Sequence, residues 1–129
     1  MQAKRLDLVE FWRLAVIKIY LAEVYLVRVY WWHMAIQSFN DPVAEEFFYS
    51  GKLKSGCGWA QIKNVAKRKL DMLDYANVLS DLKVPPKNQL EALKRDLKGF
   101  HSIRINDQWR IVFIWTSQGP KKVQIVDYH

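Results

Sequence analysis

Four short segments near the C-terminus constrain the fold most, because little chain separates each from the next. Branched and aromatic side chains, which favour strands, are concentrated in residues 90–94, 100–105, 109–115 and 122–127. Turn-forming residues separate these segments at 96–99, 106–107 and 117–120. Parallel neighbours need a crossover of about a dozen residues or more, so connections this short predict antiparallel hairpins.

The residues before these strands carry helix signals. Asp41 precedes Pro42, which gives an N-cap and a proline at the first helical position, and Glu45 supplies the acidic residue of a capping box. We therefore expect a helix over residues 42–50 that stops at Gly51. Residues 36–39 are a short strand candidate, and residues 55–58 are typical of a flexible loop.

A second helix is predicted over residues 60–74. Its apolar residues recur at three- and four-residue spacing, with basic residues between them: Ile62, Val65, Ala66, Leu70 and Leu73, against Lys63, Lys67, Arg68 and Lys69. Residues 77–82 predict a turn or short helical piece, and residues 85–88 a rigid connection. The expected architecture is α+β, with two helices on one face of a four- or five-stranded, mostly antiparallel sheet whose other face is left open.

The first 33 residues do not fit this pattern. Residues 14–32 are apolar, but Lys18, Glu23 and Arg28 interrupt them. Each central charge disfavours membrane insertion by roughly 2.5 to 3.5 kcal/mol, and no small-residue cleavage site follows, so we expect neither stable membrane association nor a signal peptide. We hypothesise that translation starts at Met34, that residues 1–33 are an upstream in-frame extension or an appended helix, and that residues 34–129 form the domain.

Composition narrows the classes of function. The formal net charge of +7 favours an anionic partner, such as a phosphate backbone, a membrane surface or an acidic protein. Cys57 is the single cysteine, so no intrachain disulfide forms, and a reducing, cytoplasmic location is expected. The chain has no glycine-rich phosphate loop and no cysteine or histidine pair at ligand spacing, so we expect no metal and no cofactor.

Cations gather on the predicted strands and on the turn that joins them: Lys94, Arg95, Lys98, Arg104 and Arg110. Strand side chains alternate between faces, so Arg104 and Arg110, each flanked by apolar residues, should point away from the apolar face. Such cations are often only solvated. A polyanion groove is favoured if Trp109, Tyr128 or Phe100 borders them, because bases stack on aromatic rings while guanidinium groups hold phosphate.

The last two residues add a titratable pair. His129 has an unperturbed pKa near 6.5 and is suited to proton transfer near neutral pH, and Tyr128 can hydrogen-bond or stack beside it. A lone histidine supports catalysis only weakly.

Three ordered motifs carry a family resemblance. They are LEALKRD at residues 90–96, SIRINDQWRI at 102–111 and VDYH at 126–129, with VAKRKL at 65–70 consistent with them. The region from Met34 to His129 resembles the HigB-like toxins of type II toxin–antitoxin systems, in the RelE/ParE superfamily, also called plasmid maintenance system killer proteins. The resemblance implies a RelE-like fold and a cytoplasmic, metal-independent endoribonuclease that cuts mRNA in the A site of the 70S ribosome by attack of the ribose 2′-hydroxyl.

The resemblance also implies roles for individual residues. Lys94 and Arg110 are candidates for stabilising the phosphate, with Arg104 as a third. The cation and aromatic pattern described above makes Arg104, Lys98, Arg95 and Trp109 candidates for RNA binding. His129 is the candidate for proton transfer and Tyr128 for positioning or stacking, while Asp127 orients them or holds the backbone. Some family members have a histidine where this chain has Glu91. Either Glu91 serves as the base, or His129 and the ribosome supply the proton chemistry, or Glu91 is structural.

The expected partners are a HigA-type helix-turn-helix antitoxin, the ribosome and mRNA, with operator DNA bound only through the antitoxin complex. The basic helix contacts rRNA or is simply a solvated face. Two other functions stay open. One is inhibition of DNA gyrase, as in ParE-type relatives, and the other is a non-catalytic RNA- or protein-binding module, such as a decayed toxin.

Overall fold

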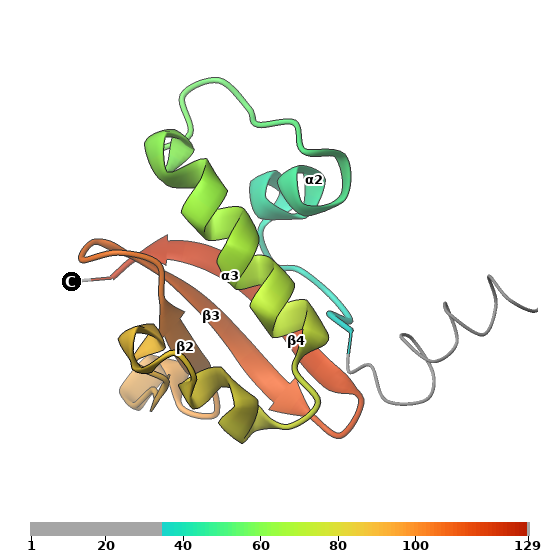
Figure 1. The fold of residues 1–129 in the computed structure, drawn as a ribbon, viewed down its shortest axis with the longest axis vertical. Helices are drawn as coiled ribbons and strands as arrows, with labels where there is room; N and C mark the ends of the chain where they lie inside the picture. Colours follow the sequence, from blue (N-terminus) through green and yellow to red (C-terminus); the bar gives the residue numbers. More distant parts are fainter. Residues whose placement is uncertain (1–34, 129) are drawn as a thin grey trace, which may run out of the picture. The chain divides into compact units, whose positions relative to one another are not determined.

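An antiparallel sheet of four strands, in the order β1-β2-β3-β4, forms the centre of the fold. The computed structural model describes residues 35–128, so the expectations for residues 1–33 and for His129 lie outside the described part. The strands are β1 (Glu91–Ala92), β2 (His101–Arg104), β3 (Trp109–Thr116) and β4 (Gly119–Asp127). Figure 1 shows the sheet with α3 (Lys63–Tyr75) crossing in front of it.

The first described helix, α2 (Pro42–Ser50), begins and ends where the sequence predicts. Asp41 Oδ1 accepts from the backbone N–H groups of Val43 and Ala44, both at 3.1 Å, and this satisfies two of the free donors at the helix start. Gly51 ends the helix with φ 76°, a left-handed conformation that costs glycine little.

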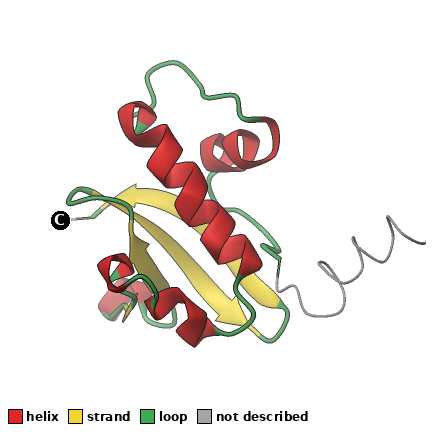
Figure 2. Cartoon of the chain, viewed as in Figure 1, coloured by secondary structure: helices red, strands yellow, loops and turns green. Residues whose placement is uncertain are grey.

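The core lies between the two helices and one face of the sheet. From α3, Ala66, Leu70 and Leu73 are fully buried, and they belong to one cluster with buried residues of the sheet and of the turn after β2: Ile103, Ile105, Ile111, Phe113, Val123 and Ile125. From α2, Ala44 and Phe47 join the same cluster, where the Phe47 ring packs edge-on against Trp59 at 5.2 Å between centroids. The described residues thus confirm an α+β fold with two helices and a four-stranded antiparallel sheet (Figure 2).

Several element boundaries differ from the prediction. β1 is only two residues long, because the chain turns away after Ala92 and Arg95 takes a left-handed φ of 57°. Strand β4 begins at Gly119, so the turn is shorter than residues 117–120. Residues 60–62 are a 3₁₀ turn that leads into α3, and residues 79–83 and 86–88 form two more such turns.

Residues 36–39, predicted as a strand, run along the outer edge of β4. Phe39 forms a parallel bridge with Val123, and Gln37 N donates to Pro120 O at 2.7 Å. Val123 N donates to Ser38 O at 3.0 Å. This short segment covers the β4 edge without becoming a full fifth strand.

The second face of the sheet is less open than expected. Ser102 and Val112 are opposite each other in the β2–β3 register and are fully buried, and Leu93 is also buried. In Figure 1 the turn Arg95–Leu97 lies behind the sheet, on the side away from α3. Within residues 35–128, no helix has the length and apolar character needed to cross a bilayer.

Candidate functional site

Arg110 lies at the centre of the candidate site, on the sheet face away from α3. In the antiparallel register Arg104 is directly opposite Arg110, and Ser102 is opposite Val112. Paired residues point to the same face, and so do alternate residues along a strand. Arg104, Arg110 and Ser102 therefore share one face, as the alternation of apolar and basic residues predicts.

Three groups hold the Arg110 guanidinium. Its Nε donates to Ser102 Oγ at 2.8 Å, and its Nη2 donates to the backbone oxygen of Gln89 at 2.5 Å. A third, weaker contact joins Nη2 to Ser102 O at 3.4 Å. Arg110 is only 7% exposed, which is rare for a charged residue that has no tight ion pair.

The electrostatics of Arg110 follow from this burial. Burial lowers the pKa of the Arg110 guanidinium, the nearby Glu91 and Tyr128 raise it, and Arg104 lowers it. Arginine is effectively always protonated in proteins, so the Arg110 guanidinium stays positively charged at neutral pH. The site therefore holds a buried positive charge with a second cation beside it.

Glu91 and Arg104 flank Arg110. The Glu91 Oε1 atom lies 3.4 Å from Arg110 Nη2, and the Glu91 side chain is 50% exposed, so it is a loose ion pair at the rim. Arg104 forms an ion pair with Asp107, whose carboxylate is almost fully exposed. Both acidic groups are open to solvent, so an incoming anion can compete with them for the two arginines.

Tyr128 follows β4 and belongs to the same face. Val126 is the register partner of Arg110, and Tyr128 is two residues further, so alternation places both on the Arg110 side. Its backbone N–H donates to Gln108 O at 2.9 Å, and the residue is 39% exposed. Asp127, on the opposite face, accepts a hydrogen bond from Gln108 Nε2 at 2.9 Å.

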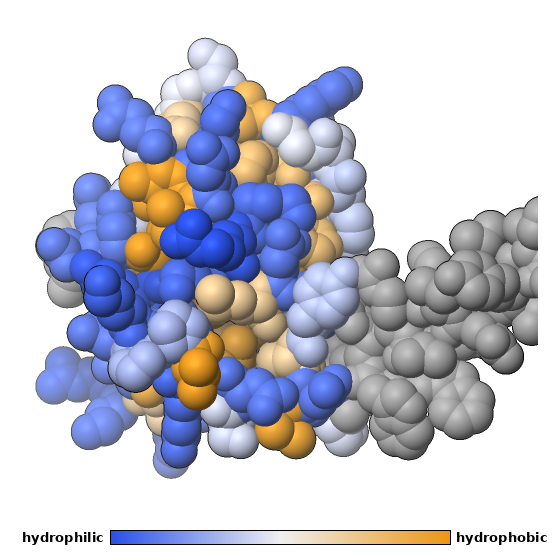
Figure 3. Space-filling model, in the orientation of Figure 1, coloured by the Kyte–Doolittle hydropathy of each residue, from blue (hydrophilic) through white to orange (hydrophobic). Residues whose placement is uncertain are grey.

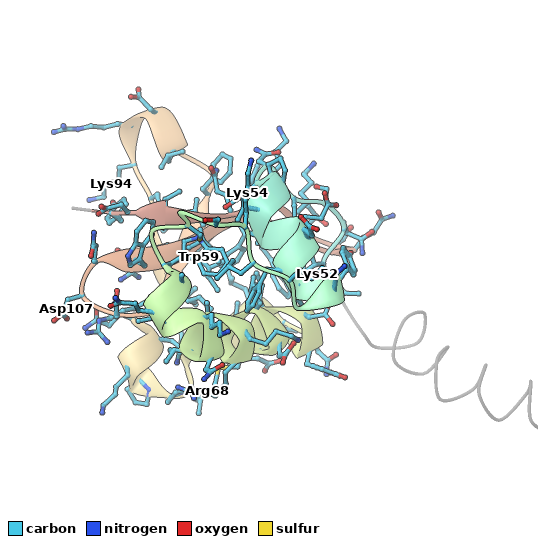
Figure 4. The ribbon with its side chains drawn as sticks, turned by 90° about the horizontal axis from the view of Figure 1, so that it is seen from above. Lys52, Lys54, Trp59, Arg68, Lys94 and Asp107 are labelled. Atoms are coloured by element: carbon cyan, nitrogen blue, oxygen red, sulfur yellow. The ribbon has the colours of Figure 1, made fainter. Side chains whose placement is uncertain are left out.

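The cations of the turn after β1 are exposed. Lys94, Arg95 and Lys98 are all open to solvent, and Lys94 O accepts the Leu97 N–H at 3.2 Å. Seen from above, Lys94 projects on the side of the molecule where β4 ends (Figure 4). The turn that carries them lies on the side of the sheet away from α3, which is also the side of Arg110 (Figure 1).

Trp109 lies on the other face of the sheet from Arg110. Its register partner is Asp127, and its ring packs against Gly58, where an added Cβ would come within 2.8 Å of the ring. With Lys54, Cys57 and others, Trp109 lines a pocket of about 290 Å³ on the α3 side. The expected border between Trp109 and the arginines is therefore not formed, whereas Tyr128 does lie beside them.

A second pocket, of about 380 Å³, lies at the outer edge of β1. It is lined by Leu79, Ser80, Lys83, Leu90, Glu91, Ala92 and His101. The half-buried His101 ring stacks on Phe113 at 6.2 Å, and its Nδ1 has no hydrogen-bond partner among the described residues. Glu91 is the lining residue that also contacts Arg110.

The basic helix divides its cations between two environments. Lys69 points inward, is 6% exposed and donates to Asn88 Oδ1 at 2.5 Å, whereas Lys67 pairs with Asp71 at the surface, also at 2.5 Å. Lys63 and Arg68 are exposed, and hydrophilic residues cover much of the face that α3 presents (Figure 3).

Sequence reasoning missed two groups at the site, Ser102 and Gln89. Ser102 is a polar residue within an apolar strand and lies two positions from Arg104, which was an available signal. Gln89 contributes its backbone oxygen across 21 residues of chain, and no local pattern shows such a contact.

Several known proteins are similar to this chain. Two solved structures align with it: the YoeB/ParE toxin from Agrobacterium tumefaciens, 18% identical, covers 74% of this chain and 99% of its own with a TM-score of 0.43. The YoeB-YefM complex from Staphylococcus aureus aligns at 21% identity, covering 73% of this chain and 94% of its own, also with a TM-score of 0.43.

Sequence comparison is more specific. Toxin HigB-1 from Vibrio cholerae serotype O1 is 42% identical over 82 residues, which is 64% of this chain and 84% of that toxin. An uncharacterised protein from Haemophilus influenzae is 32% identical over 77 residues, covering 60% of this chain and 75% of its own. Residues 37–129 match the model of the HigB-like toxin, described as the RelE-like toxin HigB of type II toxin–antitoxin systems. The chain therefore belongs to the HigB-like family of RelE-like type II toxins.

Proposed function

We propose that this toxin is a ribosome-dependent mRNA endonuclease that cuts mRNA in the ribosomal A site without a metal ion. One observation carries the proposal: the buried, charged side chain of Arg110 shares one face of the sheet with Glu91, Arg104 and Tyr128. A fixed cation is suited to the charge that develops on phosphoryl oxygens during RNA cleavage. Membership of the HigB-like family supports the same reaction class.

The reaction balances without an added reagent. The ribose 2′-hydroxyl oxygen attacks the adjacent phosphorus while a base removes its proton, and the bond to the 5′-oxygen of the next nucleotide breaks as an acid protonates that oxygen. The products are a 2′,3′-cyclic phosphate and a free 5′-hydroxyl. Arg110 and Lys94 stabilise the phosphate, and Arg104, Lys98 and Arg95 bind the RNA backbone.

Proton transfer is assigned to His129 and Glu91. The Glu91 carboxylate lies beside Arg110 and is half exposed, so it has access to an attacking hydroxyl. In this scheme Glu91 is the base and His129 the acid, or His129 carries the proton with help from the ribosome. Tyr128 positions the reacting nucleotide or stacks on its base. Trp109 lies on the other face, where it would contact RNA further from the reacting phosphate.

The proposed partner is a HigA-type helix-turn-helix antitoxin, and operator DNA is bound through that complex. The family model that matches residues 37–129 describes a toxin of a type II toxin–antitoxin system, which supports an antitoxin as the partner. Action on translating ribosomes places the toxin in the cytoplasm.

The test uses purified 70S ribosomes programmed with a defined mRNA. Wild-type toxin should cut within the A-site codon and leave a 5′-hydroxyl end. Arg110→Ala should lower the cleavage rate by about 100-fold or more, whereas Lys52→Ala, which removes an exposed cation after α2, should cleave normally. Loss of DNA supercoiling with intact mRNA would instead favour gyrase inhibition, and no effect on either would favour a binding module.

A further inference from the structure

The Arg110 guanidinium has an orientation set by the protein before any RNA arrives. We propose that Ser102 and the left-handed turn at Gln89 are positioning groups that hold Arg110 for the phosphate, an inference that rests on the proposed nuclease function. Neither group needs to touch RNA, because each acts through Arg110.

The contacts fix one edge of the guanidinium. The Ser102 hydroxyl takes Nε at 2.8 Å and the Gln89 carbonyl takes Nη2 at 2.5 Å, so two acceptors lie along the edge that these nitrogens share. A guanidinium is planar, and two bonds in its plane determine its direction. None of these bonds uses Nη1, so we assign the Nη1 edge to the phosphate oxygens.

Both acceptors are neutral, which matters for the charge. A tight carboxylate partner would orient Arg110 and also cancel its charge, but a hydroxyl and a carbonyl orient it and leave the charge intact. The Glu91 carboxylate at the rim is further away, at 3.4 Å, and its side chain is half exposed. A preorganised charge of this kind needs little rearrangement during the reaction.

The acceptors are themselves held in place. Ser102 is fully buried and pairs with Glu91 in the sheet. Gln89 is only two residues before Glu91, so strand pairing brings Ser102 close to Gln89. Gln89 has φ 45° and ψ 56°, a left-handed conformation that is uncommon for a residue with a side chain. This conformation follows the turn Pro86–Asn88 and directs the Gln89 carbonyl toward Arg110.

Asn88 fixes the turn that carries Gln89. Its buried amide donates to Leu82 O at 3.0 Å and to Val84 O at 3.3 Å, and its oxygen accepts from Lys69 of α3 at 2.5 Å. Unusual backbone conformations persist when surrounding contacts determine them, and they occur often at functional sites. The path from α3 to the Gln89 carbonyl is therefore built from specific hydrogen bonds.

The first test is kinetic. Ser102→Ala should lower the single-turnover cleavage rate on programmed ribosomes by about 10- to 100-fold, with ribosome binding nearly unchanged. Val112→Ala is the matched control, because Val112 is the buried register partner of Ser102 but is not one of the acceptors that hold Arg110. In an Arg110→Lys background, Ser102→Ala should have no further effect, because lysine has no Nε–H to orient.

The second test does not depend on cleavage. In NMR spectra, the Arg110 Nε–H signal should be protected from solvent exchange in the wild type and in Val112→Ala, and should lose protection in Ser102→Ala. If Ser102→Ala does not fold, Ser102→Cys keeps the volume with a weaker acceptor and is measured in its place. A protected Nε–H in the serine variant, or wild-type cleavage by it, would overturn the proposal. A wild type with a protected Nε–H that cuts no mRNA would instead contradict the nuclease function and leave the orientation of Arg110 intact.

Discussion

Two side chains in this toxin are both charged and buried. Arg110 is charged yet 7% exposed, and Lys69 is charged yet 6% exposed. Each donates hydrogen bonds to neutral oxygen atoms and has no tight carboxylate partner among the described residues. Burying a charged group lowers the stability of the fold unless its hydrogen bonds are made. Substitutions that remove one of these hydrogen bonds should therefore have clear effects on stability.

The first prediction concerns the C-terminal residues. Tyr128→Ala should lower the cleavage rate by about 10- to 100-fold through loss of base stacking, and deletion of His129 should lower it by about 10² to 10⁴ through loss of proton transfer. Folding and antitoxin binding should be retained in both variants. Tyr49→Ala is the control, because Tyr49 on α2 is also an exposed tyrosine, at 67%. Undiminished growth arrest by both variants would contradict the assignment of these residues.

The second prediction is a pH dependence at Lys69. Burial is the main cause that lowers the pKa of Lys69, with smaller contributions from Arg68, Arg104 and Lys87. Below the folded pKa the charged form carries the full cost of burial, and the cost disappears as pH rises toward about 10.4, where the unfolded lysine also loses its proton. Chemical denaturation should therefore show that the free energy of unfolding of wild type, relative to that of Lys69→Gln, increases as pH rises. A difference that is independent of pH would contradict this account.

Connections between elements depend on few residues, and Asp41 is the clearest case. One of its oxygens caps α2, and the other accepts the Ile125 N–H of β4 at 3.1 Å. The side chain thus joins the start of a helix to the last strand of the sheet, and the helix packs into the core through Ala44 and Phe47.

Asp41→Ala should therefore lower the free energy of unfolding by more than the loss of an ordinary helix cap does. Loss of the cap costs about 1 kcal/mol, and an unpaired Ile125 N–H adds about 1 to 3 kcal/mol. Asp41→Asn keeps one oxygen acceptor, which can cap the helix, but its amide NH2 cannot accept the Ile125 N–H, so its loss should lie between those of alanine and wild type. Urea unfolding measures both, and an alanine variant within about 0.5 kcal/mol of wild type would show that the link to β4 is not important.

The same local rules determine how far sequence predicts this fold. The limits of α2 are correct because Asp41, Pro42 and Gly51 act within a few residues of themselves. β1 is shorter than predicted because the turn after Ala92 depends on a left-handed residue, Arg95, that has no glycine signal. Alternation placed the arginines on one face, and the same alternation, applied to Trp109, puts its ring on the other face. The contact between Gln89 and Arg110 depends on tertiary packing, so no local sequence pattern predicts it.

As a whole, residues 35–128 contain a complete core of helices and sheet. The match to the HigB-like family begins at residue 37. We propose that residues 34–129 act as an independent toxin domain, with translation starting at Met34.

A chain beginning at Met34 should therefore unfold in one cooperative transition and cleave mRNA at least as fast as a chain beginning at Met1. Thermal unfolding and cleavage on programmed ribosomes measure the two properties, and intact mass of the native product identifies the start. A Met34 chain that fails to fold, or a native product that begins at Met1, would contradict the proposal.

The segment that runs beside β4 has a consequence for the toxin when it is free of its partner. A bare strand edge is a template for aggregation, and proteins protect such edges by covering or shortening them. Here residues 37–40 cover β4 through backbone hydrogen bonds, and the opposite edge strand, β1, is two residues long. Within residues 35–128 the sheet offers little backbone for another copy to extend, so toxin released at high concentration should stay dispersed rather than form fibrils.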